Sequence, residues 1–226
     1  MDVKGGDPLP ASQRWTLKEE LGNLPISSIF LEDIMQFIHN KISFYTIDFD
    51  YTNYLYNIDN QVYFNPSYLN ETKPYIGIIV NVKNLKYFVP LTSAKTKHSK
   101  QRLKTNNYIT IFETVDISAN KKGAIYKEIT NSTTEKYHLL SVLDIRKMIP
   151  VPKNCYQKID IPSLDIKQQY LLFKELSFCK QYQKEIIDRV NKLYTKTEKK
   201  GKALSDFHCD YLKLEEAMKF YKKTSM

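Results

Sequence analysis

Hydroxyl and ammonium groups are spaced to meet a phosphodiester in the segment 90–104, PLTSAKTKHSKQRLK. Thr92 and Ser93 supply hydroxyls directly after an apolar stretch, and Lys95 follows Ser93 by two residues. Residues two apart in an extended chain share one face, so Ser93 and Lys95 would lie on the same side. A hydroxyl beside an ammonium can hold a phosphodiester and stabilise charge that develops on it. The alternative is a basic surface loop whose hydroxyls make turn hydrogen bonds.

The rest of this segment is strongly cationic. After Ser93 it carries no acidic residue, and its basic side chains are Lys95, Lys97, His98, Lys100, Arg102 and Lys104. Lys73, just ahead of the apolar stretch YIGIIV, would add a second basic site, and Tyr51 and Tyr68 are nearby aromatic candidates. None of these three residues is specific alone, because tyrosines usually pack and lysines are usually solvated.

Charge and aromatic content favour a polyanionic partner. The chain has 226 residues and a net charge of +9, and 13% of its residues are aromatic. Residues 1–40 hold three basic and six acidic side chains, so the other residues hold 31 and 19 and carry a net +12. Such a surplus fits nucleic acid or an anionic membrane surface, although solvated surface lysine would also explain it. Tyrosine adds stacking on bases and hydrogen bonds to phosphate.

Several other chemistries are disfavoured by missing patterns. The four histidines show neither HExxH nor HxH spacing, and no GxxxxGK[ST] or GxGxxG is present. We therefore expect no metal and no nucleotide cofactor. Three scattered cysteines without CxxC spacing argue against a disulfide scaffold, and no stretch is apolar enough to span a membrane. A cytoplasmic protein without a membrane partner is the expectation.

Hydrophobic patterning predicts an α+β fold in which the helices come late in the chain. We expect an antiparallel sheet from strands at 42–47, 75–82, 87–91, 108–115, 124–129 and 139–145. Pro90 should place its segment at a sheet edge or a bulge. A helical turn at 48–56 and helices at 166–194 and 210–221 complete the prediction. Residues 1–40 form a separate N-terminal extension, flexible or added upstream, and residues 41–226 form the functional domain.

Four sequence blocks, in this order, carry a resemblance to a known family. FYTID stands at 44–48, KPYIGIIV at 73–80, KYFVPLTSAK at 86–95 and LDIRKMIPVP at 143–152. Together they resemble the ToxN/AbiQ family, the protein toxins of type III toxin–antitoxin systems. The resemblance covers about residues 41–221 and leaves residues 1–40 outside.

The resemblance implies an endoribonuclease with a compact, strongly twisted, barrel-like core similar to the MazF/Kid toxins. It also implies a role in phage defence by abortive infection or in plasmid maintenance, and inhibition by a small repetitive antitoxin RNA folded as a pseudoknot, in a ring-like protein–RNA assembly. The family's active-site positions fall on Tyr51, Lys73, Thr92, Ser93 and Lys95. The family's loop tyrosine falls on Tyr68, with spacing one residue longer than usual, or on Tyr63.

RNA cleavage of this kind needs little from the protein, because the nucleophile is the RNA's own 2′-hydroxyl. The protein must orient that group and stabilise the charged intermediate. We expect 2′,3′-cyclic phosphate and 5′-hydroxyl ends without a metal, with Lys95 as an electrostatic group because an ordinary lysine is a poor base at neutral pH. Expected RNA-binding residues are Tyr68, Lys97, His98, Lys100, Arg102 and Lys104. A non-catalytic RNA- or DNA-binding module is the main alternative, and a peripheral membrane or acidic-protein binder is a third.

Overall fold

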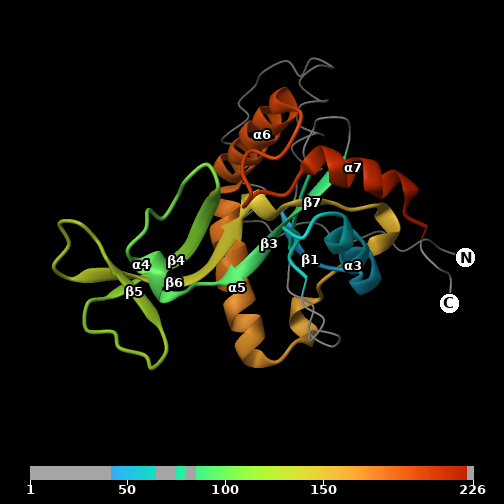
Figure 1. Cartoon of the computed structure of the whole chain (residues 1–226). Helices are drawn as coiled ribbons and strands as arrows, with labels where there is room; N and C mark the ends of the chain where they lie inside the picture. Colours follow the sequence, from blue (N-terminus) through green and yellow to red (C-terminus); the bar gives the residue numbers. More distant parts are fainter. Residues whose placement is uncertain (1–41, 65–74, 80–84, 223–226) are drawn as a thin grey trace, which may run out of the picture. The chain divides into compact units, whose positions relative to one another are not determined.

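The computed structural model describes residues 42–64, 75–79 and 85–222, all within the unit Lys41–Met226 (Figure 1). The N-terminal extension, Tyr68 and Lys73 lie outside the described residues. An antiparallel sheet of eight strands forms the centre of the described part. Its strands are β1 (Ser43–Ile47), β2 (Tyr75–Ile79), β3 (Lys86–Ser93), β4 (Tyr108–Asp116), β5 (Ile125–Glu128), β6 (Glu135–Asp144), β7 (Ile149–Pro150) and β8 (Tyr156–Lys158).

The strands run in the order β4-β6-β3-β2-β1-β8, with β5 beside β6 and β7 beside β3. The predicted α+β class and antiparallel pairing are confirmed. The barrel is not, because β4 and β8 end the path and do not pair with each other in the described part of the chain. The short strands β7 and β8 were missed by the sequence prediction, since two or three residues are too few to show a period-2 pattern.

Strand β3 is interior to the sheet, so the expected edge position for Pro90 is wrong. On one flank β3 pairs continuously with β2. On the other flank it pairs with β7 at Tyr87 and Phe88, and then with β6 from Leu91 to Ser93. Pro90 falls between these two partners, where a backbone without an N–H group costs no ladder hydrogen bond. The change of partner thus lets a proline sit inside a central strand.

Five helices surround the sheet in the described residues: α3 (Phe49–Ile58), α4 (Thr96–Ser99), α5 (Ile166–Gln181), α6 (Gln183–Lys200) and α7 (Tyr211–Phe220). Three of them begin at an aspartate whose carboxylate accepts backbone N–H bonds, namely Asp48, Asp165 and Asp210. Short 3₁₀ turns follow β6 as η2 (Ile145–Lys147), precede β8 as η3 (Lys153–Cys155), and precede α5 as η4 (Ile161–Ser163).

The single helix predicted over 166–194 is in fact two helices. Tyr182 leaves helical geometry with φ −103° and ψ 20°, and α6 begins at the next residue. Its ring packs on Phe178 at 4.5 Å between centroids, and the Lys104 ammonium lies 3.6 Å from the ring centre. The Phe178 contact is local, one helical turn away, whereas Lys104 comes from a distant segment, and no proline or glycine marks the break in the sequence.

The core lies between the sheet and the late helices and contains several buried tyrosines. Tyr87 of β3, Tyr194 of α6 and Tyr211 of α7 are all fully buried. The hydroxyls of Tyr87 and Tyr194 each donate to Glu215 Oε1 of α7 at 2.6 Å. All three cysteines are buried and form no disulfide. None of the helices in the described ranges is long and apolar enough to cross a membrane.

Candidate functional site

A cleft of about 470 Å³ opens where β3 ends. Its walls combine hydroxyl, cationic and aromatic side chains, and the lining residues are Tyr63, Thr92, Ser93, Lys95, Lys97, His98, Gln101, Tyr108, Val142, Asp144 and Arg146. Four of these side chains, those of Thr92, Ser93, Lys95 and Lys97, make no hydrogen bond or ion pair with any described residue. The cleft therefore presents hydroxyl and ammonium donors that remain available to an anionic ligand.

The register of the sheet sets which residues share the cleft face. Thr92 of β3 pairs with Val142 of β6, which pairs with Thr110 of β4. The next row on the same face joins Asp144 of β6 to Tyr108 of β4. Directly paired residues point to the same side of a sheet, as do residues two apart. Chain segments more than 50 residues apart in sequence thus supply one continuous surface.

A short turn holds Lys95 at the mouth of the cleft. The Lys95 backbone N–H donates to His98 Nδ1 at 2.8 Å, and the backbone N–H of His98 donates to the Lys95 carbonyl at 2.8 Å. Because a backbone N–H can only donate, Nδ1 is the acceptor and the neutral ring carries its proton on Nε2. Burial, with Lys97 and Lys95 close by, lowers the pKa of His98. The uncharged ring that this turn requires is therefore the favoured form.

This hydrogen bond predicts a pH-dependent difference between the wild type and a His98→Ala variant. Above the ordinary histidine pKa of about 6.5 the neutral ring caps the turn, and the variant should be less stable by roughly 1 kcal/mol. A lowered folded-state pKa means that this contribution is lost as the pH falls through that pKa. Urea denaturation from pH 8 to pH 4.5 measures it. A stability difference that persists unchanged at the acid end would contradict this assignment.

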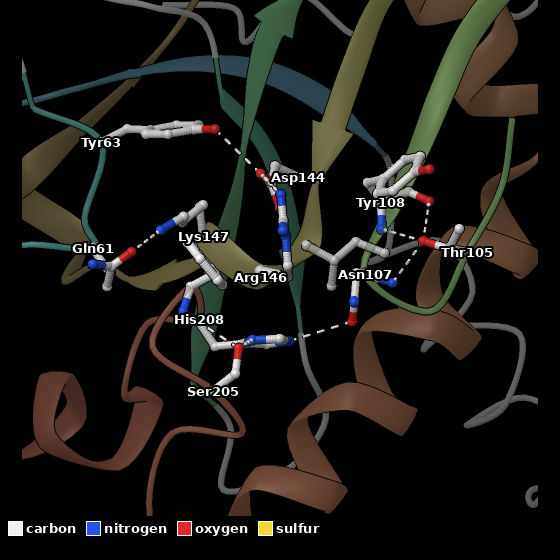
Figure 2. Close-up of polar contacts among 12 residues, drawn as sticks. Gln61, Tyr63, Thr105, Asn107, Tyr108, Asp144, Arg146, Lys147, Ser205 and His208 are labelled. Carbon is white, nitrogen blue, oxygen red and sulfur yellow. Dashed lines mark hydrogen bonds and ion pairs between the residues drawn. The ribbon is translucent and has the colours of Figure 1, made fainter. Parts of the chain in front are cut away.

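The opposite wall of the cleft is built around an ion pair. Arg146 donates to Asp144 through Nε at 2.8 Å and through Nη2 at 2.7 Å, and Tyr63 donates its hydroxyl to Asp144 Oδ2 at 3.2 Å (Figure 2). Hydrogen bonding to Asp144 raises the pKa of Arg146 further. Thr105 Oγ1 accepts the backbone N–H groups of Asn107 and Tyr108, and this turn sets the Tyr108 ring on the other side of the pair.

The structure brings some of the predicted site residues together in the cleft and places others outside it. Thr92, Ser93, Lys95, Lys97 and His98 all line the cleft. Lys100 and Arg102 are exposed and lie outside its lining.

Lys104 points elsewhere, because its ammonium pairs with Glu185 at 2.7 Å and lies over the Tyr182 ring. Tyr51 is also placed elsewhere: it is fully buried and donates its hydroxyl to the Pro150 carbonyl at 2.7 Å. Its pKa is raised above the ordinary tyrosine value, first of all by that burial. Of the two loop tyrosines, Tyr63 lines the cleft, whereas Tyr68, like Lys73, is outside the described residues.

Sequence reasoning missed Tyr108, Asp144 and Arg146 as residues of this site. Each lies at or just beyond the end of a strand, and only the register of β4, β6 and β3 brings it beside Thr92. The one signal in the sequence was the Asp-x-Arg pattern at the end of the apolar run of β6, which places a carboxylate and a guanidinium near each other. The partner strand could not have been identified from that pattern alone.

Comparisons with known proteins agree on one family. The family model described as "Toxin ToxN, type III toxin-antitoxin system" matches residues 43–219. The endoribonuclease ToxN of Bacillus thuringiensis subsp. kurstaki is 29% identical over 189 residues, which cover 80% of this chain and 84% of that protein. The endoribonuclease AbiQ of Lactococcus lactis subsp. lactis is 27% identical over 207 residues, covering 88% of this chain and 98% of that protein.

A solved structure shows the same fold. It comes from work on selective toxin inhibition by a non-coding RNA pseudoknot in bacterial type III toxin–antitoxin systems, and it has a TM-score of 0.59 and 25% identity to this chain. The match covers 82% of this chain and the whole of the other. The residues that the family model matches include all those that line the cleft.

Proposed function

Because this chain belongs to the ToxN family of type III toxin–antitoxin systems, we propose that it is an endoribonuclease toxin that cleaves RNA at the cleft beside β3. The observation that carries the proposal is the set of Thr92, Ser93 and Lys95 side chains at and just after the end of β3, which line one cleft and have no hydrogen-bond partner among the described residues. Its named relatives are endoribonucleases, which agrees with that chemistry. By the same family membership, we propose that it serves in phage defence by abortive infection or in plasmid maintenance.

The proposed reaction is attack of a ribose 2′-hydroxyl on the adjacent phosphorus. The 2′-hydroxyl gives up its proton to solvent as the bond from O2′ to phosphorus forms. The bond to the 5′-oxygen of the next nucleotide breaks, that oxygen takes up a proton from solvent, and the products are a 5′-hydroxyl end and a 2′,3′-cyclic phosphate. In this scheme the Thr92 and Ser93 hydroxyls bind non-bridging phosphate oxygens, and the Lys95 ammonium stabilises the charge that builds on the phosphorane. No metal takes part.

Positioning and charge stabilisation carry most of the proposed rate enhancement. His98 accepts a backbone N–H at Nδ1, and both Asp144 oxygens accept hydrogen bonds. We therefore assign neither group the role of general base. Holding the 2′-hydroxyl in line with the leaving oxygen supplies much of the effect in reactions of this type. We keep Lys73 as a proposed second cation. For Tyr51 we propose a supporting part, since its hydroxyl secures Pro150 of β7 beside β3.

We further propose that the cleft and its basic surroundings bind an antitoxin RNA of repeated pseudoknots in a ring-like assembly. The solved relative from work on inhibition by an RNA pseudoknot supports this proposal. Lys97, Lys100 and Arg102 are the described cations that would follow the RNA backbone, while Tyr63 and Tyr68 offer rings for its bases. A tandem array of short repeats in the DNA just upstream of the coding region is the expected genetic sign.

Cleavage in EDTA separates this function from that of a non-catalytic RNA- or DNA-binding module. Purified protein incubated with total RNA and EDTA should release fragments whose 5′ ends accept phosphate from polynucleotide kinase without prior phosphatase treatment. Retention of intact RNA would instead favour the binding module.

Affinity for uncleavable RNA should fall steeply with salt, with a log–log slope of about −0.7 for each phosphate contact. Fluorescence anisotropy between 50 and 300 mM NaCl measures that slope. A flat response would remove the electrostatic part of the proposal.

A further inference from the structure

Arg146 combines two features that no other described residue of the cleft shares. It lines the same cavity as Ser93 and Lys95, and its guanidinium is fixed rather than free to move. Nε and Nη2 donate to the two oxygens of Asp144, while Nη1 has no acceptor among the described residues. When a guanidinium is bound through Nε and one Nη2 proton, its outer edge still carries an Nη1 proton and the second Nη2 proton. These two N–H groups can donate to two more acceptors.

Hydrogen bonds hold both the backbone and the side chain of Arg146. It lies in η2 directly after β6, where its backbone N–H donates to the Asn107 carbonyl and its own carbonyl accepts from Cys209 N–H. Asp144 has a side chain that is 5% exposed, and it is additionally held by the Tyr63 hydroxyl. Arg146 itself keeps 29% of its side chain exposed. The buried carboxylate therefore aims a partly exposed cation into the cleft.

We propose that Arg146 binds a second phosphate of the bound RNA, distinct from the one that is cleaved, and that Asp144 and Tyr63 are its positioning residues. This inference rests on the proposed function and names a second phosphate subsite for the same cleft. Two non-bridging phosphate oxygens match the open end of a guanidinium in both charge and geometry.

The sheet register indicates why the ligand of Arg146 is a different phosphate from the one that is cleaved. Thr92 pairs with Val142 and Ser93 with Ser141, so Asp144 lies two residues along β6 from the Thr92 row, on the side away from Ser93 and Lys95. Two residues of strand correspond to about 7 Å. An RNA strand whose cleaved phosphate lies at Thr92, Ser93 and Lys95 would therefore pass Arg146 with another of its phosphates. Tyr63 and Tyr108 lie on either side of the Arg146–Asp144 pair and both line the cleft, where the bases of the strand would meet them (Figure 2).

A methylphosphonate scan tests the subsite independently of cleavage. The probes are 2′-O-methyl oligonucleotides, which lack the nucleophile and stay intact, with one linkage at a time made neutral. For the wild type, neutralising the linkage whose phosphate Arg146 binds should weaken binding about tenfold or more, as expected for a charged hydrogen-bonded contact. With Arg146→Gln the unmodified probe should bind that much more weakly, and the same linkage should no longer matter. Arg146→Lys, which keeps the charge but not the fork, should fall between.

Two further variants separate positioning from general effects. Asp144→Asn should reduce sensitivity at the same linkage by several fold, because an amide accepts only at its oxygen and cannot hold the guanidinium by both donors. Lys122→Gln removes one exposed charge that does not line the cleft, and it should leave the scan unchanged.

The proposal is overturned if no linkage loses its sensitivity in Arg146→Gln, or if the loss follows the base beside the linkage rather than its charge. RNA cleavage in EDTA is measured separately on the wild type. If the wild type does not cleave RNA but Arg146→Gln still removes the sensitivity at one linkage, the proposed function is refuted and the phosphate subsite is supported.

Discussion

Replacing Lys95 with alanine should lower the rate of RNA cleavage by about a hundred- to a thousandfold, the range seen when one preorganised charge-stabilising donor is removed from an active site. The ammonium has no hydrogen-bond or ion-pair partner among the described residues and stands at the mouth of the cleft with Ser93. Its charge is therefore free to act on the phosphorane. Single-turnover cleavage with excess enzyme measures the chemical step, and toxicity in cells should disappear in parallel.

Controls for this substitution lie in the same basic segment. Lys95 is exposed, so the melting temperature of Lys95→Ala should stay close to that of the wild type. Lys100→Ala removes an exposed cation five residues away that does not line the cleft, and it should reduce cleavage only slightly. Cleavage by Lys95→Ala at near wild-type rate would show that charge stabilisation at this position is not part of the reaction.

Replacing Glu215 with alanine should destabilise the fold by about 2–5 kcal/mol, because two buried hydroxyls would lose their acceptor at once. Tyr87 and Tyr194 both donate to Glu215 Oε1 at 2.6 Å. The Tyr194 hydroxyl would lose its 2.6 Å acceptor, and the Tyr87 hydroxyl would keep the Tyr211 carbonyl, at 3.5 Å, as a weak one. Both buried hydroxyls thus keep the cost of leaving water with little compensation. Urea denaturation followed by tyrosine fluorescence and circular dichroism measures the loss.

The adjacent Glu216 provides a matched control for that variant. Its side chain is 59% exposed, and among the described residues it pairs with Lys219 on the same helix and with no other. Glu216→Ala should therefore change stability by less than about 0.5 kcal/mol. Glu215→Gln, whose amide oxygen can still accept, should cost less than Glu215→Ala. Equal stabilities of the Glu215→Ala and Glu216→Ala chains would contradict the role assigned to the tyrosine pair.

The sequence was most informative where local pattern and family resemblance coincide. The apolar run of β3 and the block PLTSAK placed Thr92, Ser93 and Lys95 together, and the structure brings them to one cleft. Site residues whose positions depend on strand pairing could not be predicted from the sequence, and Asp144 is the clearest case. A single sequence does not state that β6 lies between β3 and β4.

Lys104 shows the opposite difficulty, because its position in a basic run suggested RNA contact. In the structure Glu185 of α6 and the ring of Tyr182 occupy its ammonium. A run of like charges is easily seen in a sequence, but the partners that neutralise one of its members come from distant segments. The helix break at Tyr182 depends on the same packing and was missed for the same reason.

The strand that carries the cleft is completed by the last helix to be synthesised. Tyr87 and Ser93 belong to the same strand, and α7 supplies Glu215 to the first of them. A ribosome that stalls before α7 would release a chain whose central strand lacks this support. Truncation within α7 should therefore weaken the strand that carries Ser93 as well as the core around Tyr87.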